Sequence, residues 1–443
     1  MFYFIVILIA VILMIVAIQK YDMHPFIVMT VISILVGLAC GIPPEKVIAT
    51  VKTGFGGIMG NIGIVILCGT IIGTILEKTG AALTMANTIL NLVGEKRSVL
   101  TMAITGYVTG IPVFCDSGFV ILSPISRALA FRSKTSLAVM ATALSGGLYA
   151  THCLVPPTPG PIAMAGTLNA DLGLTILVGL IISIPATLAA YIYAMKVSSK
   201  IDIPANPEYT VEELVEKYGH LPGALHSFAP ILLPIILITL KSIGDFPSAP
   251  FGKGAFKAFF SFIGNPVVAL IIGVFIAMTL IPKSEKKSTL KWITEGVSNS
   301  AAILAITGAG GSFGAIIQKL PIAEALSNSL LGLGVGVFLP FLIAALLKCA
   351  MGASTVAMIT TSAMIAPMLG SLGLTSPLGR VLTIMAIGAG SMTVSHANDS
   401  YFWVVSQFSD MNTSQAYKCQ TGMTGVMGIV TIIVVYIITQ VAL

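Results

Sequence analysis

The chain has 443 residues, of which 56% are hydrophobic and only 9% are charged. Because soluble domains carry roughly 25% charged residues, this composition excludes a soluble protein and indicates an integral membrane protein. The net charge of +6 does not require a nucleic acid as partner, since membrane proteins hold Lys and Arg in their cytoplasmic loops. Regular alternation of apolar and polar residues is missing, so we expect helices in the lipid bilayer rather than a membrane β-barrel.

The six cysteines lie in or beside apolar segments and show no CxxC or CxxH spacing. We therefore expect free thiols, with neither a metal site nor disulfides. P-loop, HExxH and GxSxG motifs are also missing, so the sequence indicates no cofactor and no ATP-driven pump.

Apolar windows of the length that a membrane helix needs, about 20 residues, recur from the start of the chain. The window 2–18 has no basic residue before it and no small-residue cleavage site after it, so we expect a retained helix rather than a signal peptide. The polar stretch 196–226 is predicted to be a linker with a short helix. The predicted membrane segments are 2–18, 24–40, 59–77, 98–113, 116–131, 136–152, 160–195, 227–243, 262–281, 300–318, 334–350, 354–370, 381–395, 400–408 and 421–441.

Two parts of the chain repeat each other. "TGFGGIMGNIGIVILCGTIIGTILEK" (53–78) aligns without gaps with "TEGVSNSAAILAITGAGGSFGAIIQK" (294–319). A weaker match follows in the same order, between "GGLYATH" ending at His152 and "GSMTVSH" ending at His396. A repeat of this length indicates two related structural units.

The basic residues predict that the two units are inserted in opposite orientations. With the N-terminus outside, the basic groups at 96–97, 127–134, 196–200 and 283–291 fall on the cytoplasmic side, as the positive-inside rule requires. Inverted repeats are typical of secondary transporters, whose binding site lies near the membrane midplane. We therefore predict an all-α polytopic membrane protein with two inverted-topology repeats. Its parts are N-terminal transmembrane helices (1–50), a first transport repeat (51–195), a linker with connecting helices (196–291) and a second, inverted transport repeat (292–443).

Each repeat contains a pair of segments too short to span the membrane separately. A polar turn follows the first segment of each pair, at 116–118 in the first repeat and 352–355 in the second. We expect re-entrant hairpins with their tips at these turns. Two tilted spans with polar kinks are the alternative.

Each repeat also contains a break in a helix. Four prolines between 156 and 161 remove backbone donors and stop the helix after His152, and "SHANDSYFW" (395–403) breaks the second repeat. Backbone groups freed at such breaks must face protein or a water-filled cavity. The helix that follows points its positive N-terminus into that cavity, where an anion is favoured. Two hairpin tips and two discontinuous helices therefore predict one binding site.

At these motifs the sequence resembles the gluconate permease family of proton symporters, within the wider ion-transporter superfamily. The carrying stretches are "GFVILSPI", "THCLVPPTPGPIAMAGTLNADLG", "KCAMGASTVAMITTSAMIAP" and "SHANDSYFW". The resemblance implies uptake of a sugar acid such as gluconate with a proton. Members of that family carry other residues at the positions of Asp116, Ser117, Thr158 and Lys348, which bears on the identity of the substrate more than on its class.

The candidate site residues each have a functional and a structural reading. Asp116, at a hairpin tip, is our predicted proton carrier, because a carboxyl group taken out of water favours its protonated form; a simple helix cap is the alternative. His152 is predicted to relay that proton, or to be a structural hydrogen bonder. Lys348 is predicted to bind the substrate carboxylate, or to extend to a membrane interface. The predicted substrate-binding residues are Asp116, Ser117, His152, Thr158, Lys348, Ser354, Thr355, His396, Asn398 and Asp399.

The sequence thus predicts a secondary active transporter in the inner (plasma) membrane that imports a small hydroxylated monocarboxylate, gluconate or a related sugar acid, with protons. A sodium-coupled carboxylate carrier is one alternative, and an intramembrane enzyme using the Asp and His pairs is another. The expected partners are the anionic substrate, the proton and the lipid bilayer, with a homodimer as a possible assembly.

Overall fold

The computed structural model describes residues 2–21, 23–94, 97–205, 221–244, 251, 254–320, 336–396 and 399–443, and the regular elements in these ranges are all helices. The all-α prediction is therefore confirmed. The elements are α1 (Phe2–Tyr21), α2 (Pro25–Ala39), α3 (Pro44–Lys78), α4 (Ala81–Val93), α5 (Ser98–Thr109), α6 (Cys115–Arg132), α7 (Leu137–Leu154), α8 (Pro159–Thr167), α9 (Leu172–Lys196), α11 (Ala224–Gly244), α12 (Ala255–Ile263), α13 (Pro266–Thr279), α14 (Thr289–Gln318), α16 (Phe338–Met351), α17 (Ser354–Ile365), α18 (Pro377–Met392), α19 (Ser400–Phe408), α20 (Thr413–Ala416) and α21 (Gly422–Ala442).

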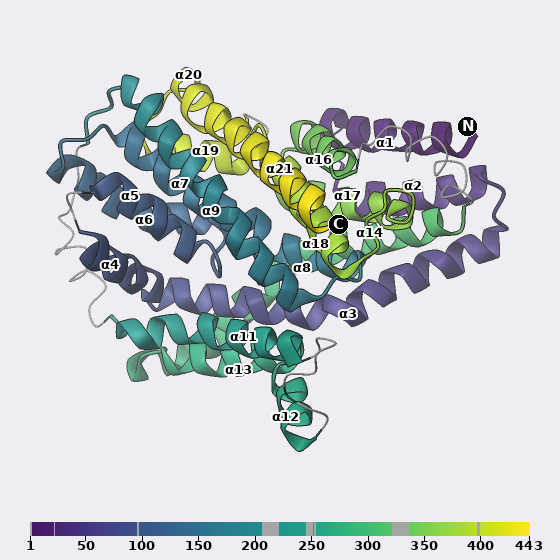
Figure 1. The fold of residues 1–443 in the computed structure, drawn as a ribbon, viewed down its shortest axis with the longest axis horizontal. Coiled ribbons are helices and arrows are strands. Elements are labelled where there is room, and N and C mark those ends of the chain that lie inside the picture. Colours follow the sequence, from purple (N-terminus) through teal and green to yellow (C-terminus); the bar gives the residue numbers. More distant parts are fainter. Residues whose placement is uncertain are drawn as a thin grey trace.

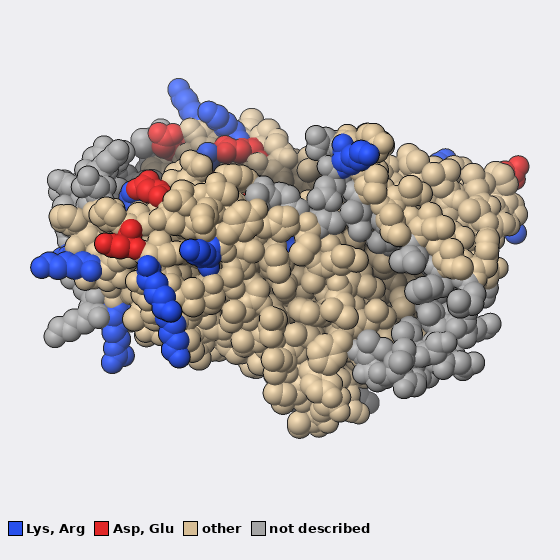
Figure 2. All heavy atoms as spheres, turned by 90° about the horizontal axis from the view of Figure 1, so that it is seen from above, with Lys and Arg blue, Asp and Glu red and all other residues tan. Residues whose placement is uncertain are grey.

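Several of these helices have the length and apolar composition of membrane spans. Within the described ranges, five helical stretches are long and apolar enough to cross a membrane, or up to seven if each of two bent pairs counts as one span. Figure 2 shows Lys, Arg, Asp and Glu gathered mainly toward one end of the visible face, beside a broad surface that carries none of them. Such an uncharged surface is what contact with lipid tails requires.

Apart from α4 in the first part and α20 in the second, the described helices of the two repeated parts follow the same order and pack in a corresponding way. Each part has a long helix (α3, α14), two short consecutive helices (α5–α6, α16–α17), a core helix (α7, α18), a short helix after a break (α8, α19) and a long final helix (α9, α21). Packing follows the same correspondence: α5 lies on α7 as α16 lies on α18, and α7 lies on α9 as α18 lies on α21. The two parts also exchange contacts, since α6 packs against α19 and α17 against α8.

The equivalent helices α3 and α14 pack against each other in opposite directions (Figure 1). Lys78 Nζ at the end of α3 lies 2.8 Å from Glu295 Oε1 near the start of α14. Gly54, at the other end of α3, lies against Gly311, and at the middle Gly63 faces Leu304. In the alignment of 53–78 with 294–319, Gly63 and Leu304 are equivalent positions. The helices α3 and α14 therefore contact each other at equivalent residues in the middle, as two helices related by a two-fold axis do.

The centre of the molecule is formed by α7 and α18. All residues of α7 are buried, as are nearly all residues of α18, and the two helices contact each other. Small residues on these helices allow this close packing: a side chain at Gly147 would meet the backbone of α5, and one at Gly390 the backbone of α16. Both helices end at the breaks, so the breaks lie inside the protein and not at a membrane surface.

Several predicted segments differ from the observed helices. The predicted segment 160–195 is two helices, because Asn169 takes a positive φ of 50° and Asp171 caps α9 by accepting a hydrogen bond from Leu174 N at 2.6 Å. Helix α3 begins at Pro44 rather than at residue 59, and α4 was not predicted. Residues 206–220 of the predicted linker, 196–226, lie outside the described residues.

The ends of the two short helices α8 and α19 are held by arginines from the opposite repeat. Arg127 on α6 donates to Phe408 O at the end of α19 (3.0 Å) and bonds both carboxylate oxygens of Asp410 (2.6 and 2.9 Å). Arg380 on α18 donates to Leu168 O at the end of α8 (2.6 Å). Hydrogen bonding by Arg127 lowers the pKa of the Asp410 carboxyl below its ordinary value.

Replacing Asp410 by asparagine is expected to remove a small, acid-sensitive part of the stability. The folded pKa of Asp410 is depressed, so its contribution is present above the unfolded pKa of about 3.9 and is lost as pH falls through the folded value. Because the pair is partly exposed, we expect the loss to be below about 1 kcal/mol. Thermal unfolding of the purified wild type and Asp410→Asn at neutral pH and below pH 4 measures it; an equal difference at both pH values would contradict the assignment.

Candidate functional site

The most buried charges of the described part of the chain form one ion pair. Lys348 Nζ, near the end of α16, lies 2.6 Å from Asp399 Oδ2, directly before α19. Their side chains are 0% and 5% exposed. The expectation that Lys348 could extend to an interface is therefore wrong, because its ammonium group points into the protein. The pair joins the second hairpin motif to the second helix break.

Local backbone geometry sets the position of Lys348. Helix α16 ends at Met351, and Gly352 follows with a φ of 77°, a left-handed conformation that glycine adopts without strain. This turn brings the Gly352 carbonyl back over the helix end, where it accepts a hydrogen bond from Lys348 Nζ. A cation is favoured there, at the negative end of α16.

Asp399 is held from both of its carboxylate oxygens. Oδ1 accepts a hydrogen bond from Tyr401 N at 3.1 Å, which makes Asp399 the N-cap of α19. Oδ2 accepts one from Ser395 Oγ at 2.5 Å in addition to the Lys348 contact. In the first repeat, Thr158 occupies the corresponding N-cap of α8, but its hydroxyl donates to Val155 O at 2.5 Å. Thr158 is buried, and its hydroxyl group stabilises the turn before α8.

Aromatic side chains from both repeats enclose the ion pair. The Tyr149 ring lies with its centroid 5.7 Å from Lys348 Nζ and 5.1 Å from the centroid of Tyr401. Tyr149 OH and Ser354 Oγ, at the start of α17, are 2.5 Å apart. Ser354 thus lies beside the ion pair at the start of α17, whereas Thr355, the next residue of that helix, is only half-buried.

Asp116 lies in the first turn of α6, close enough to Asp399 and Lys348 to interact with both electrostatically. Its Oδ1 is buried without a hydrogen-bond partner among the described residues. A buried carboxylate oxygen without a partner costs free energy and is uncommon in folded proteins. Ser117 is half-buried and interacts instead with Glu77 at the end of α3.

The two histidines lie in different surroundings, although the sequence match places them together. His152 is buried within α7, with its ring stacked on Tyr149 at a centroid distance of 6.4 Å, and its Nδ1 has no partner among the described residues. His396 lies beyond the end of α18 and contacts Cys349 O through Nε2 at 3.0 Å. The two histidines therefore do not share the same local structure. Asn398 lies outside the described residues.

Sequence reasoning did not identify the polar residues behind the aromatic side chains. Tyr401 OH donates to Ser145 O at 3.2 Å, and Ser145 Oγ donates to Gln420 Oε1 at 2.7 Å. Gln420 belongs to a π-helical turn, Tyr417–Thr421, a feature that is frequent at functional sites. Tyr401 and Gln420 could have been identified from the sequence, because each is a residue with a polar group inside an apolar stretch.

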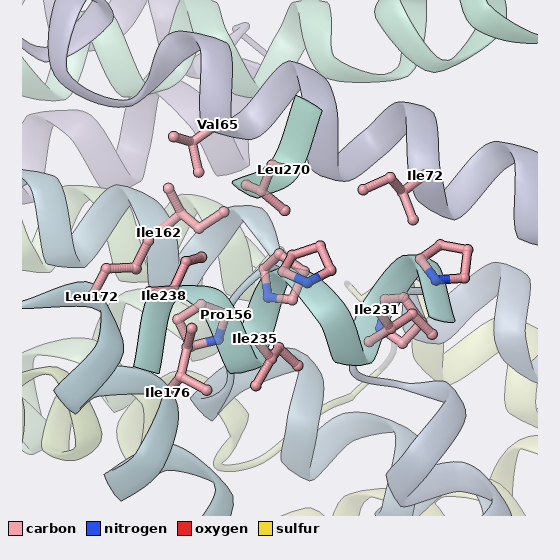
Figure 3. A pocket seen from close by; sticks show the side chains of 14 residues that line it. Val65, Ile72, Pro156, Ile162, Leu172, Ile176, Ile231, Ile235, Ile238 and Leu270 are labelled. Carbon is pink, nitrogen blue, oxygen red and sulfur yellow. The ribbon is translucent and has the colours of Figure 1, made fainter. Parts of the chain in front are cut away.

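A separate apolar pocket adjoins the first break (Figure 3). It is bounded by α3, α8, α9, α11 and α13, and its wall includes Pro156 and Pro157 of the break together with Ile162, Ile176 and Ile231. A pocket with this lining offers no partner to a carboxylate. The charged cluster around Lys348 contains a buried ammonium group and is the candidate site for an anion.

The fold and the site together define a polytopic membrane transporter with a charged site enclosed between two repeated units. The chain matches the GntP family permease model over residues 2–441. It is 33% identical to the gluconate permease of Pseudomonas aeruginosa over 445 residues, with 98% of this chain and 97% of that protein covered. It is 32% identical to the D-serine transporter DsdX of Escherichia coli over 422 residues, with 94% of each covered. In fold it is similar to the YdaH transporter of Alcanivorax borkumensis, with a TM-score of 0.67, 13% identity, and 94% of this chain and 98% of that one covered.

The chain belongs to the GntP family of permeases. The predicted family resemblance is confirmed, and so is the prediction of a transporter rather than an enzyme, because the relatives are permeases and transporters. The chain is a multi-pass protein of the inner membrane, as predicted.

Proposed function

We propose that the chain imports a small hydroxylated monocarboxylate, gluconate or a related sugar acid, together with protons. The observation that carries this proposal is the buried ammonium group of Lys348, because a cation enclosed by protein is a strong partner for a carboxylate. The hydroxyls of Tyr149, Ser354 and Ser395 around it are suited to the hydroxyl groups of the same substrate. The side chain of Lys348 is fully buried, so the substrate reaches it only when the protein opens.

The relatives support this class of substrate. One is a gluconate permease and another a D-serine transporter, and both of these molecules carry a carboxylate and at least one hydroxyl group. The shared chemistry is what Lys348 and the surrounding hydroxyls select. A hydroxylated amino acid such as D-serine is therefore the second candidate substrate.

The packing supports transport by two inverted repeats, corresponding to 51–195 and 292–443. The antiparallel packing of α3 on α14 supports this, because a two-fold axis through the midpoint of the pair would relate two repeats of opposite membrane insertion. The contacts of α6 with α19 and of α17 with α8 also support it, since each proposed hairpin then lies beside the proposed broken helix of the other repeat. Rocking of one unit against the other would then open the site to each side in turn.

For coupling, we propose Asp116 as the proton carrier and His152 as its relay. Asp116 Oδ1 and His152 Nδ1 are both buried without a hydrogen-bond partner among the described residues, so each can accept a proton without first losing a bond. The sodium-coupled alternative predicts accumulation under a sodium gradient without a proton gradient.

Uptake of labelled gluconate into liposomes with purified protein tests the proposal. We expect accumulation under an inward proton gradient, with competition by unlabelled gluconate or D-serine and none by glucose, because glucose lacks a carboxylate for Lys348. Accumulation under a sodium gradient alone would support the alternative. Competition by glucose as strong as that by gluconate would contradict the anion site.

A further inference from the structure

Asp399 holds Lys348 as a bound carboxylate would. Its Oδ2 lies 2.6 Å from Lys348 Nζ and accepts a hydrogen bond from Ser395 Oγ at 2.5 Å. A substrate carboxylate needs the same partners, a cation and a hydroxyl donor. One ammonium group is therefore suited to two carboxylates, one within the chain and one on the substrate.

The charges around Lys348 leave no second cation for that substrate. Lys348 is the one buried Lys or Arg side chain among the described residues. Two aspartates, Asp116 and Asp399, already interact with it, and a third carboxylate would add net negative charge at low dielectric. The other titratable groups that face this cluster come from α6, α7, α16 and α19, and are Cys115, Tyr149, His152, Cys153, Cys349 and Tyr401.

Building on the proposed function, we propose that Asp399 occupies the carboxylate subsite of the transporter, and that the substrate binds by displacing Asp399 from Lys348. Asp399 can leave the ammonium group without losing all its partners, because Oδ1 accepts from Tyr401 N at the positive end of α19. Only the Oδ2 contacts need to break. The affinity for substrate is then set by competition between the two carboxylates.

The substitution Asp399→Asn isolates this role. Asparagine is as good an N-cap as aspartate, so the hydrogen bond from Tyr401 N is kept while the negative charge on Lys348 is removed. We expect Asp399→Asn to bind gluconate more tightly than the wild type by about tenfold or more, the scale of one charge-assisted hydrogen bond. Isothermal titration of the full-length protein in detergent measures this.

The matched control is Asp116→Asn, which removes a negative charge from the same cluster without touching Lys348. If reduced repulsion alone tightened binding, both variants would gain affinity equally. Competition for Lys348 predicts a much larger gain for Asp399→Asn. Equal gains, or unchanged or weaker gluconate binding by Asp399→Asn, would overturn the proposal.

A second measurement covers a variant that folds poorly and a substrate that is not gluconate. Formate carries only the carboxylate, so it should raise the melting temperature of Asp399→Asn more than that of the wild type. The double variant Lys348→Met/Asp399→Asn should show no such gain. If formate stabilises all three proteins equally, Asp399 does not occupy a carboxylate subsite. If formate behaves as expected but the wild type binds neither gluconate nor D-serine, the substrate class is wrong while the subsite stands.

Discussion

Replacing Lys348 by alanine is expected to destabilise the protein by about 3–5 kcal/mol, the range for breaking one partner of a buried ion pair. The reason is Asp399, whose side chain is 5% exposed in the wild type and would lose the cation beside it. From the sequence alone, Lys348→Ala would be expected to weaken substrate binding and leave expression intact. The ion pair changes that expectation, because Lys348 also neutralises the buried carboxylate of Asp399, which caps α19.

The double variant Lys348→Met/Asp399→Asn separates the two roles. It removes both charges while keeping the bulk of Lys348 and the cap of α19, so most of the lost stability should return. Gluconate binding should not return, since the cation is gone. Thermal unfolding in detergent and gluconate titration of the wild type and both variants measure the two effects. If Lys348→Ala were as stable as the wild type, Asp399 would have found another partner.

The broad architecture could be predicted because apolar windows and proline breaks are local features of the sequence. The internal repeat is found by comparing the sequence with itself. The start of α3 was missed because its glycine-rich first half reads as a poor helix. In the structure one of those glycines, Gly54, lies against Gly311 of α14, where a side chain would meet the backbone of that helix. Asn169 and Asp171 indicate the division of 160–195 into two helices. The division was not predicted because apolar residues on both sides make the stretch look like one continuous membrane segment.

The site was predicted as a set of residue types and not as a geometry. Lys348, Asp399 and Asp116 are polar residues in apolar surroundings, which marks them individually. Their pairing depends on how α16, α6 and the second break meet, and nothing in the sequence near any of them specifies this. The same holds for the histidines, whose matching motifs hide that α7 continues past His152 while α18 ends before His396.

Replacing Asp116 by asparagine is expected to abolish accumulation driven by a proton gradient while leaving exchange of internal for external substrate largely intact. Asparagine keeps the size and hydrogen-bonding capacity of aspartate but cannot take up and release a proton. Exchange requires the site to face each side with substrate bound and involves no net proton movement. Accumulation requires the carrier to return with its proton exchanged, which the variant cannot do.

The position of Asp116 gives this prediction its physical basis. Its carboxylate shares the cluster with Asp399 and a single ammonium group, and its Oδ1 has no hydrogen-bond partner among the described residues. A proton on Asp116 therefore removes the repulsion from Asp399 and the cost of an unpaired charged oxygen. When the substrate displaces Asp399 from Lys348, the preference of Asp116 for its protonated form would increase. Liposomes loaded with unlabelled gluconate report exchange, and empty liposomes under a pH gradient report accumulation. If Asp116→Asn still concentrates gluconate under the gradient, the proton is carried elsewhere, and Asp399 and His152 become the groups to test. Loss of both activities would instead assign Asp116 to substrate binding or to the fold.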